Sequence, residues 1–200
     1  MSMTETNSKM LTGLITQLDA LENAEAKVGW FESAVYENGR PVAAVAAGNE
    51  VGIPSRSIPP RPFFRPTADA KEAEWGKTAE TMAGRVIEGK ATAEEAMEVL
   101  GLKAGGDVLE TIVSITSPAL SPITILARAY RKNGKDVTGK TIGEIAGLIK
   151  NQRYDITASQ MAGVSTKPLN DTGHMIATLS SVTINNGQKT SEIPIAGGAE

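Results

Sequence analysis

The chain has 200 residues, enough for one large domain or two small ones. Apolar residues make up 40% and charged residues 22%, a composition typical of globular proteins. The 20 Lys and Arg residues against 23 Asp and Glu residues give a formal net charge of −3, so the chain lacks the basic excess with which duplex-binding domains displace counterions. This composition argues against nucleic acid as the main binding partner.

The sequence is poor in residue types that support catalysis. It contains no Cys, which excludes disulfides, thiolate metal sites and Cys nucleophiles and agrees with a reducing compartment. His174 is the only histidine, so any mechanism that needs two imidazoles is excluded. No apolar run approaches the roughly 18 residues of a membrane span, and the N-terminus has no signal-peptide pattern. We therefore expect a non-enzymatic protein, made in the cytoplasm, that needs no cofactor or metal.

The first 50 residues predict two helices around a strand. Apolar residues at helical spacing predict a first helix, capped by Ser8, with a stripe that should pack against another surface: Met10, Leu11, Leu14, Ile15, Leu18 and Leu21. Residues 27–36 are typical of a strand, and Asn38-Gly39 indicates a turn after it. The Ala-rich residues 41–47 favour a short helix that ends at a following glycine, with a second strand as the alternative.

A proline-rich segment follows. Five of the ten prolines lie between Val51 and Pro66 and disfavour both helix and central strand, which predicts an extended arm over residues 53–66. The arm carries three Arg, no acidic residue and two of the three Phe. These Phe must be buried in the chain's own domain or against another chain. We predict that the arm contacts a neighbouring subunit or an adjoining ring through Arg56, Pro59, Pro60, Arg61, Phe63, Phe64 and Arg65.

Four helices are predicted between the arm and residue 150. They are expected over residues 67–89, 92–113, 121–132 and 138–149. Thr92 and Glu95 form a capping-box pattern at the start of the second helix, and Gly105 predicts a break within it. Ser121 and Thr138 are the predicted N-caps of the last two helices.

The C-terminal part predicts a strand and a tail. Asp171-Thr172-Gly173 precedes a short helical run and then a strand over residues 179–184. We interpret this motif as structural: Asp171 or Thr172 caps the turn, and Gly173 takes a backbone conformation closed to other residues, which directs the strand into a sheet. Asn186-Gly187 predicts a last turn, and residues 185–200 are expected to form a mobile tail unless a partner orders them.

Gly134 to Thr141 satisfies the P-loop pattern G-x-x-x-x-G-K-[ST]. A P-loop follows a buried strand, whereas residues 127–133 are typical of the polar end of a helix. We therefore interpret the segment as a loop between helices, and nucleotide binding is the alternative function from another class. A third alternative is nucleic-acid binding through the arginines of the arm.

Two further clusters have simpler structural interpretations. Asp171 and His174 are three residues apart, a spacing at which their side chains touch on a helix, but no nucleophile motif accompanies them and a surface histidine is favoured. Glu94, Glu95 and Glu98 are carboxylates at the start of a predicted helix, where the helix dipole favours negative charge, and this is a solvated face rather than a metal site.

Four pieces of the sequence occur in an informative order. They are residues 28–31 (Val28-Gly29-Trp30-Phe31), 41–52 (Pro41 to Gly52, with Asn49-Glu50-Val51-Gly52 at the end), 58–66 (Ile58-Pro59-Pro60-Arg61-Pro62-Phe63-Phe64-Arg65-Pro66) and 167–173 (Lys167-Pro168-Leu169-Asn170-Asp171-Thr172-Gly173). Together they resemble the neck and tail-completion proteins of long-tailed bacteriophages. The resemblance covers about residues 26–70 and 117–185, with Leu120 to Arg128 as its middle landmark.

The chain departs from that family pattern in three places. Val51 stands where an aromatic residue is usual, His174 stands where an apolar or basic residue is usual, and residues 135–166 form an inserted segment before the Asp-Thr-Gly motif. These departures leave open which position in the neck the chain would occupy.

The resemblance implies an α+β fold, with a small antiparallel sheet packed against several helices. It implies one domain over residues 1–184, with a helical insertion at 135–166. It further implies a non-catalytic virion protein of the neck or tail, which forms a homo-oligomeric ring, hexameric in the family. The implied neighbours are portal-side connector proteins and tail tube or terminator proteins, with non-specific passage of genomic DNA and no membrane contact. Tail terminator and minor tail protein are the alternatives within the virion.

Overall fold

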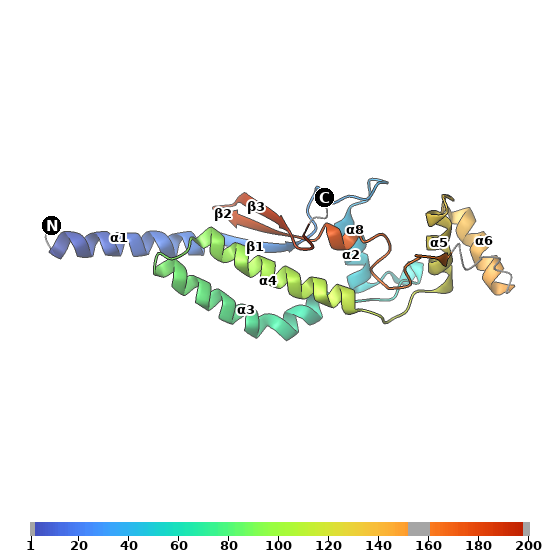
Figure 1. Ribbon diagram of the computed structural model, residues 1–200, viewed down its shortest axis with the longest axis horizontal. Coiled ribbons are helices and arrows are strands. Elements are labelled where there is room, and N and C mark those ends of the chain that lie inside the picture. The colour runs from blue at the N-terminus through green and yellow to red at the C-terminus, as the bar shows by residue number, and fades with distance from the viewer. Residues whose placement is uncertain (1–2, 152–160, 198–200) are drawn as a thin grey trace.

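A computed structural model describes residues 3–151 and 161–197, and it has the expected α+β fold. Its elements are α1 (Met3–Glu22), β1 (Ala24–Gly29), α2 (Val42–Val51), the 3-10 helix η1 (Pro54–Arg56), α3 (Phe64–Ile87), α4 (Ala93–Ser114), α5 (Pro122–Lys132), α6 (Gly139–Lys150), α8 (His174–Ala177), β2 (Ser180–Asn185) and β3 (Gln188–Pro194). The molecule is elongated, with α1 projecting at one end, the sheet with α3 and α4 in the middle, and α5 and α6 at the other end (Figure 1).

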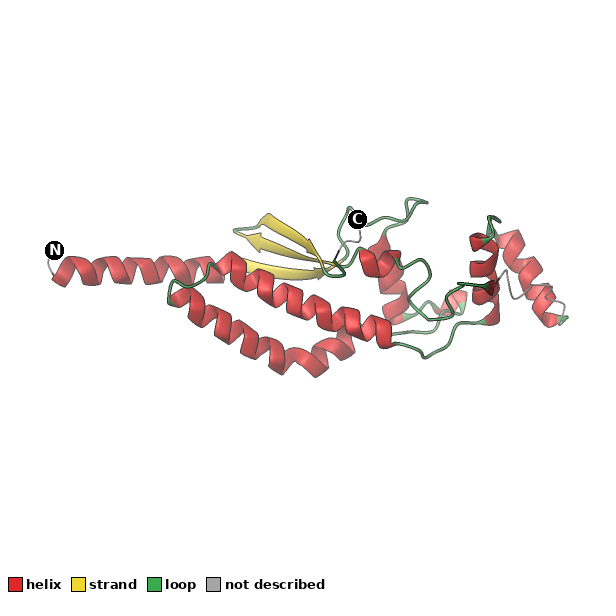
Figure 2. Ribbon diagram, viewed as in Figure 1, coloured by secondary structure: helices red, strands yellow, loops and turns green. Residues whose placement is uncertain are grey.

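The sheet joins strands from both ends of the chain (Figure 2). Its order is β1-β2-β3, and both pairs are antiparallel, so β2 is central and β1 is an edge strand. The prediction of a mobile tail over residues 185–200 is wrong for β3. Asn186 and Gly187, at φ 50° and 75°, turn the chain back, and β3 then pairs along β2.

The segment between β1 and α2, residues 30–41, is a loop with turns rather than more strand. The first strand was predicted over residues 27–36, but β1 ends at Gly29. The Asn38-Gly39 turn is confirmed, because the Gly39 N–H donates to the carbonyl oxygen of Tyr36 at 2.8 Å. Helix α2 is also confirmed over the strand alternative, and it ends at Gly52, whose φ of 77° favours glycine.

Helix α4 lies directly on the sheet and does not break at Gly105, contrary to the sequence prediction. Its glycines allow a close approach instead. A Cβ at Gly101 would lie 2.0 Å from Ser181 Oγ, and one at Gly105 would lie 2.3 Å from Ile195 Cδ1. The capping box of Thr92 and Glu95 forms as predicted and fixes the start of the helix.

Helix α3 begins earlier than the predicted residue 67, because a carboxylate from α2 caps it. Glu50 Oε2 accepts hydrogen bonds from the backbone N–H groups of Phe63 (2.6 Å) and Phe64 (3.1 Å), and Oε1 accepts from that of Arg65 (3.3 Å). These are donors that the first turn of a helix leaves without an internal partner. The helix ends as predicted before Gly89, which has a φ of 70°.

Among the described residues, two hydrophobic clusters hold the fold together. The larger one joins the sheet, α2, α3 and α4, and its buried members include Val42, Phe63, Ile112, Met175 and Leu179. The smaller one joins α5 and α6 through Leu126, Ala127 and Ile145. Both of these helices have the predicted N-caps, Ser121 and Thr138. The α5–α6 pair therefore has a small core of its own, at a distance from the sheet (Figure 1).

Candidate assembly surfaces

Helix α1 carries an apolar stripe that the described chain does not cover. The predicted helix is confirmed, although Ser8 lies inside it and is not its N-cap. The α1 stripe consists of five exposed side chains: Met10, Leu11, Leu14, Ile15 and Leu18. Near its C-terminal end, α1 approaches the turn between α3 and α4, where Gln17 Nε2 would lie 3.6 Å from a Cβ at Gly89. The rest of the helix projects away from the body (Figure 1).

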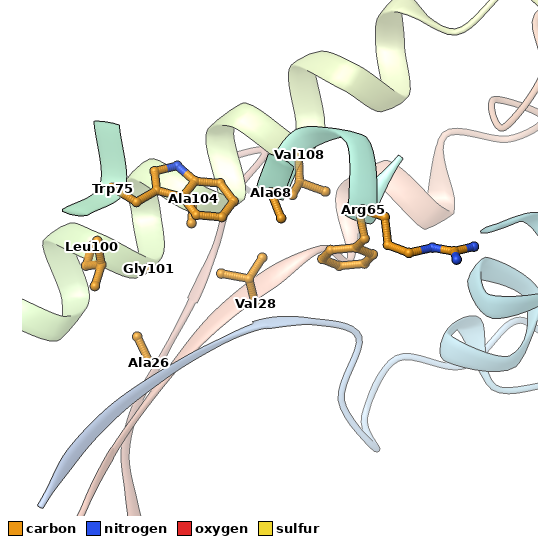
Figure 3. A pocket seen from close by; sticks show the side chains of 10 residues that line it. Ala26, Val28, Arg65, Ala68, Trp75, Leu100, Gly101, Ala104 and Val108 are labelled. Atoms are coloured by element: carbon orange, nitrogen blue, oxygen red, sulfur yellow. The ribbon is translucent and has the colours of Figure 1, made fainter. Parts of the chain in front are cut away.

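A second uncovered surface is an apolar groove between α3, α4 and the edge strand β1, with a volume of about 410 Å³ (Figure 3). Small and aliphatic side chains line it, among them Ala26, Val28, Ala68, Ala104 and Val108. Trp75 also lines the groove, and its Nε1–H donates to Asp107 Oδ2 at 2.7 Å, which anchors the indole. The groove is therefore preformed by packed side chains, with Arg65 toward one end.

The Pro-rich arm belongs largely to the chain's own core. Phe63 is fully buried and packs edge-on against Trp30, with ring centroids 5.9 Å apart. Arg61 is 5% exposed and donates to the carbonyl oxygens of Pro118 (2.8 Å) and Ala119 (3.2 Å). This corrects the prediction that Phe63 and Arg61 contact a neighbouring subunit or an adjoining ring, because both side chains are buried within the chain itself. A chain with so few aromatic residues uses Phe63 to fill the core beside its small sheet.

The other arm residues remain candidates for partner contact. Arg56, Pro60 and Arg65 are exposed, and Pro59 and Phe64 are partly buried. The arm is not extended throughout, since its start forms η1. Phe64 packs against Trp30 and also lines the groove. The end of the arm, at Phe64 and Arg65, therefore lies at the groove.

The Asp-Thr-Gly motif is structural in part as predicted. Gly173 has a φ of 78°, and Thr172 Oγ1 accepts a hydrogen bond from the His174 N–H at 3.3 Å. Asp171 does not cap this turn. Its carboxylate instead pairs with Arg128, with Oδ1 3.3 Å from Nε, and with Arg131. The motif therefore ties the start of α8 to α5.

His174 does not pair with Asp171. Its Nε2 lies 2.9 Å from the carbonyl oxygen of Val35, and its ring packs against Tyr36 with centroids 5.0 Å apart. Burial raises the pKa of the Tyr36 hydroxyl, and the negative charge of Asp171 raises it further. The histidine thus connects α8 to the loop after β1, which is a structural role.

Arg128 is a buried charge that organises the loop before α8. Its Nη1 donates to the carbonyl oxygens of Ser165 (2.8 Å), Lys167 (3.0 Å) and Asn170 (3.1 Å). Burial lowers the pKa of the guanidinium, and the Asp171 carboxylate opposes that effect. Together with the ion pair between Arg128 and Asp171, these hydrogen bonds attach helices α5 and α6 to the rest of the chain.

Sequence reasoning gave no role to two charged residues that each make several hydrogen bonds, Glu50 and Arg128. Arg128 had a usable signal, since it is the only charged residue between Glu110 and Arg131 and has an alanine on either side. A charge in that position is buried only with partners. Glu50 had no such signal, because the N–H groups that it binds lie 13 to 15 residues away.

The P-loop-like segment from Gly134 to Thr141 connects α5 to α6 and follows a helix, as the sequence interpretation expects. Thr138 and Thr141 are used in capping α6. Within residues 3–151 and 161–197, no group of three or more His, Asp or Glu side chains is arranged to hold a metal ion. Over the same residues, no helix is long and apolar enough to cross a membrane.

No protein-family model matches the sequence, and neither the curated proteins nor the solved structures give a significant match. The features of this chain that point to a function are therefore its own: the α1 stripe, the groove and the exposed part of the arm.

Proposed function

We propose that the chain is a non-catalytic structural protein of a bacteriophage virion, which forms a ring at the head–tail interface and joins the connector to the tail. The observation that carries this proposal is the pair of separate apolar surfaces, the α1 stripe and the groove. Contiguous exposed apolar surface of this kind marks interaction sites. Two different surfaces on one chain suit a head-to-tail contact between identical subunits, and such contacts form a ring when the rotation closes.

Sequence features support the head–tail interface as the location. The segments 58–66 and 167–173 resemble those of neck and tail-completion proteins, and they lie in the fold where they brace the body against the α5–α6 pair. The net charge of −3 also suits a channel through which DNA slides, because a strongly basic lumen would hold the phosphate backbone. The proposed neighbours are connector proteins on one side and tail tube or terminator proteins on the other.

The proposal is tested by removing the chain from the phage that encodes it. We expect lysates without the chain to accumulate DNA-filled heads and separate tails, and purified protein added to such lysates to restore joined particles and infectivity. Electron microscopy counts joined and separate particles directly. Normal numbers of joined, infectious particles in the absence of the chain would refute the proposal.

A further inference from the structure

The open edge of the sheet at β1 carries backbone groups that no strand pairs with. The carbonyl oxygen of Asn23 accepts a hydrogen bond from the Asn186 N–H, which fixes the phase of the ladder between β1 and β2. Hydrogen-bonded positions alternate along an antiparallel ladder, so the N–H and carbonyl groups of Ala26 and Val28 face away from β2. Within residues 3–151 and 161–197, no further strand pairs with this edge.

The other edge strand, β3, is protected against pairing, and β1 is not. The Ile195 N–H bonds to the carbonyl oxygen of Leu179 on the side of β2, so Pro194 stands at an outward-facing position and offers no N–H there. The pairing of β3 with β2 also contains a register shift. Prolines and bulges are features that protect exposed sheet edges. β1 has no proline and an uninterrupted register, so it is the edge that can accept another strand.

The apolar groove lies where such a strand would run. Among the described strands, β1 alone lines the groove, so α3 stands on the open-edge side of α4. Helix α3 packs against α4 rather than against a strand. Two helices side by side cover about 20 Å, the width of roughly four strands, whereas this sheet has three. Figure 3 shows Val28 and Ala68 facing each other across the groove. The space beside β1 under α3 therefore matches one missing strand.

We propose that one extended segment of another protein adds to β1 as a fourth strand and fills the groove under α3. Main-chain hydrogen bonds to Ala26 and Val28 provide the affinity, as in other strand-addition complexes. Every second side chain of the segment enters the groove and is apolar, because the groove lining is apolar. The side chains between them lie beside Glu25 and Lys27, which are exposed on the other face, and opposite charges suit those positions.

A second copy of the chain does not fit this position with its own sheet. Helix α4 packs on β1 and β2. Antiparallel pairing of two β1 edges keeps both helix layers on one face of the joined sheet, and it places the second copy's α4 where α3 stands. Addition through β3 would use the protected edge. A lone extended segment brings no helix layer with it, so it is the occupant that the space under α3 admits.

A synthetic peptide tests the strand addition. The probe is acetyl-Thr-Val-Glu-Val-Lys-Val-Thr-amide, which runs antiparallel to β1 with its Val side chains in the groove, its Glu opposite Lys27 and its Lys opposite Glu25. Amide hydrogen exchange of the full-length protein, followed by NMR, is the readout. In the free protein, the Ala26 and Val28 N–H groups should exchange fast and that of Lys27 slowly. At high occupancy of the probe, exchange at Ala26 and Val28 should slow by about tenfold or more.

Two controls separate strand addition from other modes of binding. A probe with Pro in place of its central Val lacks the N–H that bonds to the Ala26 carbonyl, and it should bind about tenfold more weakly or worse. On the protein, Ala68→Leu fills part of the groove and should weaken binding of the original probe to a similar extent. Ala70→Leu, on the exposed side of α3, is the matched variant and should leave binding unchanged. Thermal unfolding of both variants shows that they are folded.

Three results would overturn the proposal. The first is the absence of binding at probe concentrations up to about 1 mM. The second is binding that leaves exchange at Ala26 and Val28 unchanged, or that the central Pro does not weaken. The third is slow exchange at both residues that develops without the probe as the protein concentration rises, because a second copy would then pair with β1.

This inference does not depend on the proposed function, since any assembly partner can supply an extended segment. Its test uses the purified chain and no virions. Failure of the probe to bind would leave the proposed function standing, and joined particles formed without the chain would leave the strand addition standing.

Discussion

Glu50 provides the sharpest test of how the fold is held together, since its carboxylate caps α3 from a different helix. Glu50→Ala removes the acceptor for the N–H groups of Phe63 and Phe64, which are shielded from water, and for the more exposed N–H of Arg65. Loss of a helix cap costs about 1 kcal/mol, and hydrogen bonds to a charged group contribute about 1.5–3 kcal/mol each. We expect a loss of roughly 3 kcal/mol in the free energy of unfolding, measured by urea denaturation near neutral pH.

Glu80→Ala is the matched control, because Glu80 is an exposed carboxylate on α3 itself. It should change the unfolding free energy by less than about 0.5 kcal/mol. Equal effects of the two substitutions would refute the capping role of Glu50.

The same carboxylate makes a prediction about pH. Burial by itself raises the pKa of Glu50, but the backbone N–H donors of Phe63, Phe64 and Arg65 outweigh burial, and the net shift is downward. The carboxylate therefore contributes its full stability above the unfolded-state pKa of about 4.3, and that contribution is lost as the pH falls through the lower folded-state value. The difference in stability between the natural chain and Glu50→Gln should narrow on acidification over this window. A difference that does not vary with pH would contradict this explanation.

Four further substitutions, one of them a control, test the packing by urea denaturation. Phe63→Ala should lower the free energy of unfolding by about 3–5 kcal/mol, because the side chain is fully buried in the chain's own core. A folded monomer of unchanged stability would show instead that Phe63 contacts a partner. Gly101→Ala should destabilise the protein by about 1–3 kcal/mol, because the new methyl group clashes with Ser181. Gly106→Ala, which has open space around it on α4, should stabilise the protein by about 0.5–1 kcal/mol. A stability change of the same sign in both variants would be inconsistent with the close approach of α4 to the sheet. Asp171→Ala should cost about 1–3 kcal/mol by leaving the buried Arg128 without its carboxylate, and no loss would show that the carbonyl partners suffice.

Local patterns predicted most of the helices because the signals for a helix lie within a few residues. Thr92 with Glu95, Ser121 and Thr138 each mark a helix start that the structure confirms. The predicted break at Gly105 was wrong because a glycine in a helix can mark either a break or a close approach to another element. Only the position of the sheet distinguishes the two. The C-terminal tail failed for a similar reason: β3 is weakly apolar and is held by its partner strand rather than by its own composition.

The candidate surfaces were predicted less well because burial is not a local property. The arm was expected to place Phe63 against a partner, yet the small sheet needs that ring for its own core. The spacing of apolar residues predicted the stripe on α1. Its exposure depends on the one-residue connection at Asn23 and on the direction in which α1 projects, and the sequence pattern indicates neither. The groove requires α3, α4 and β1 together, and no single segment indicates it.

The central claim is that this chain forms part of the ring between head and tail. Electron cryomicroscopy of purified virions, with the chain marked by a specific antibody fragment, tests it most directly. We predict that the label decorates a ring at the junction between the connector and the tail, and that the ring density accommodates the elongated subunit. Label found on the capsid shell or at the tail tip, or virions that carry no label at all, would contradict the claim.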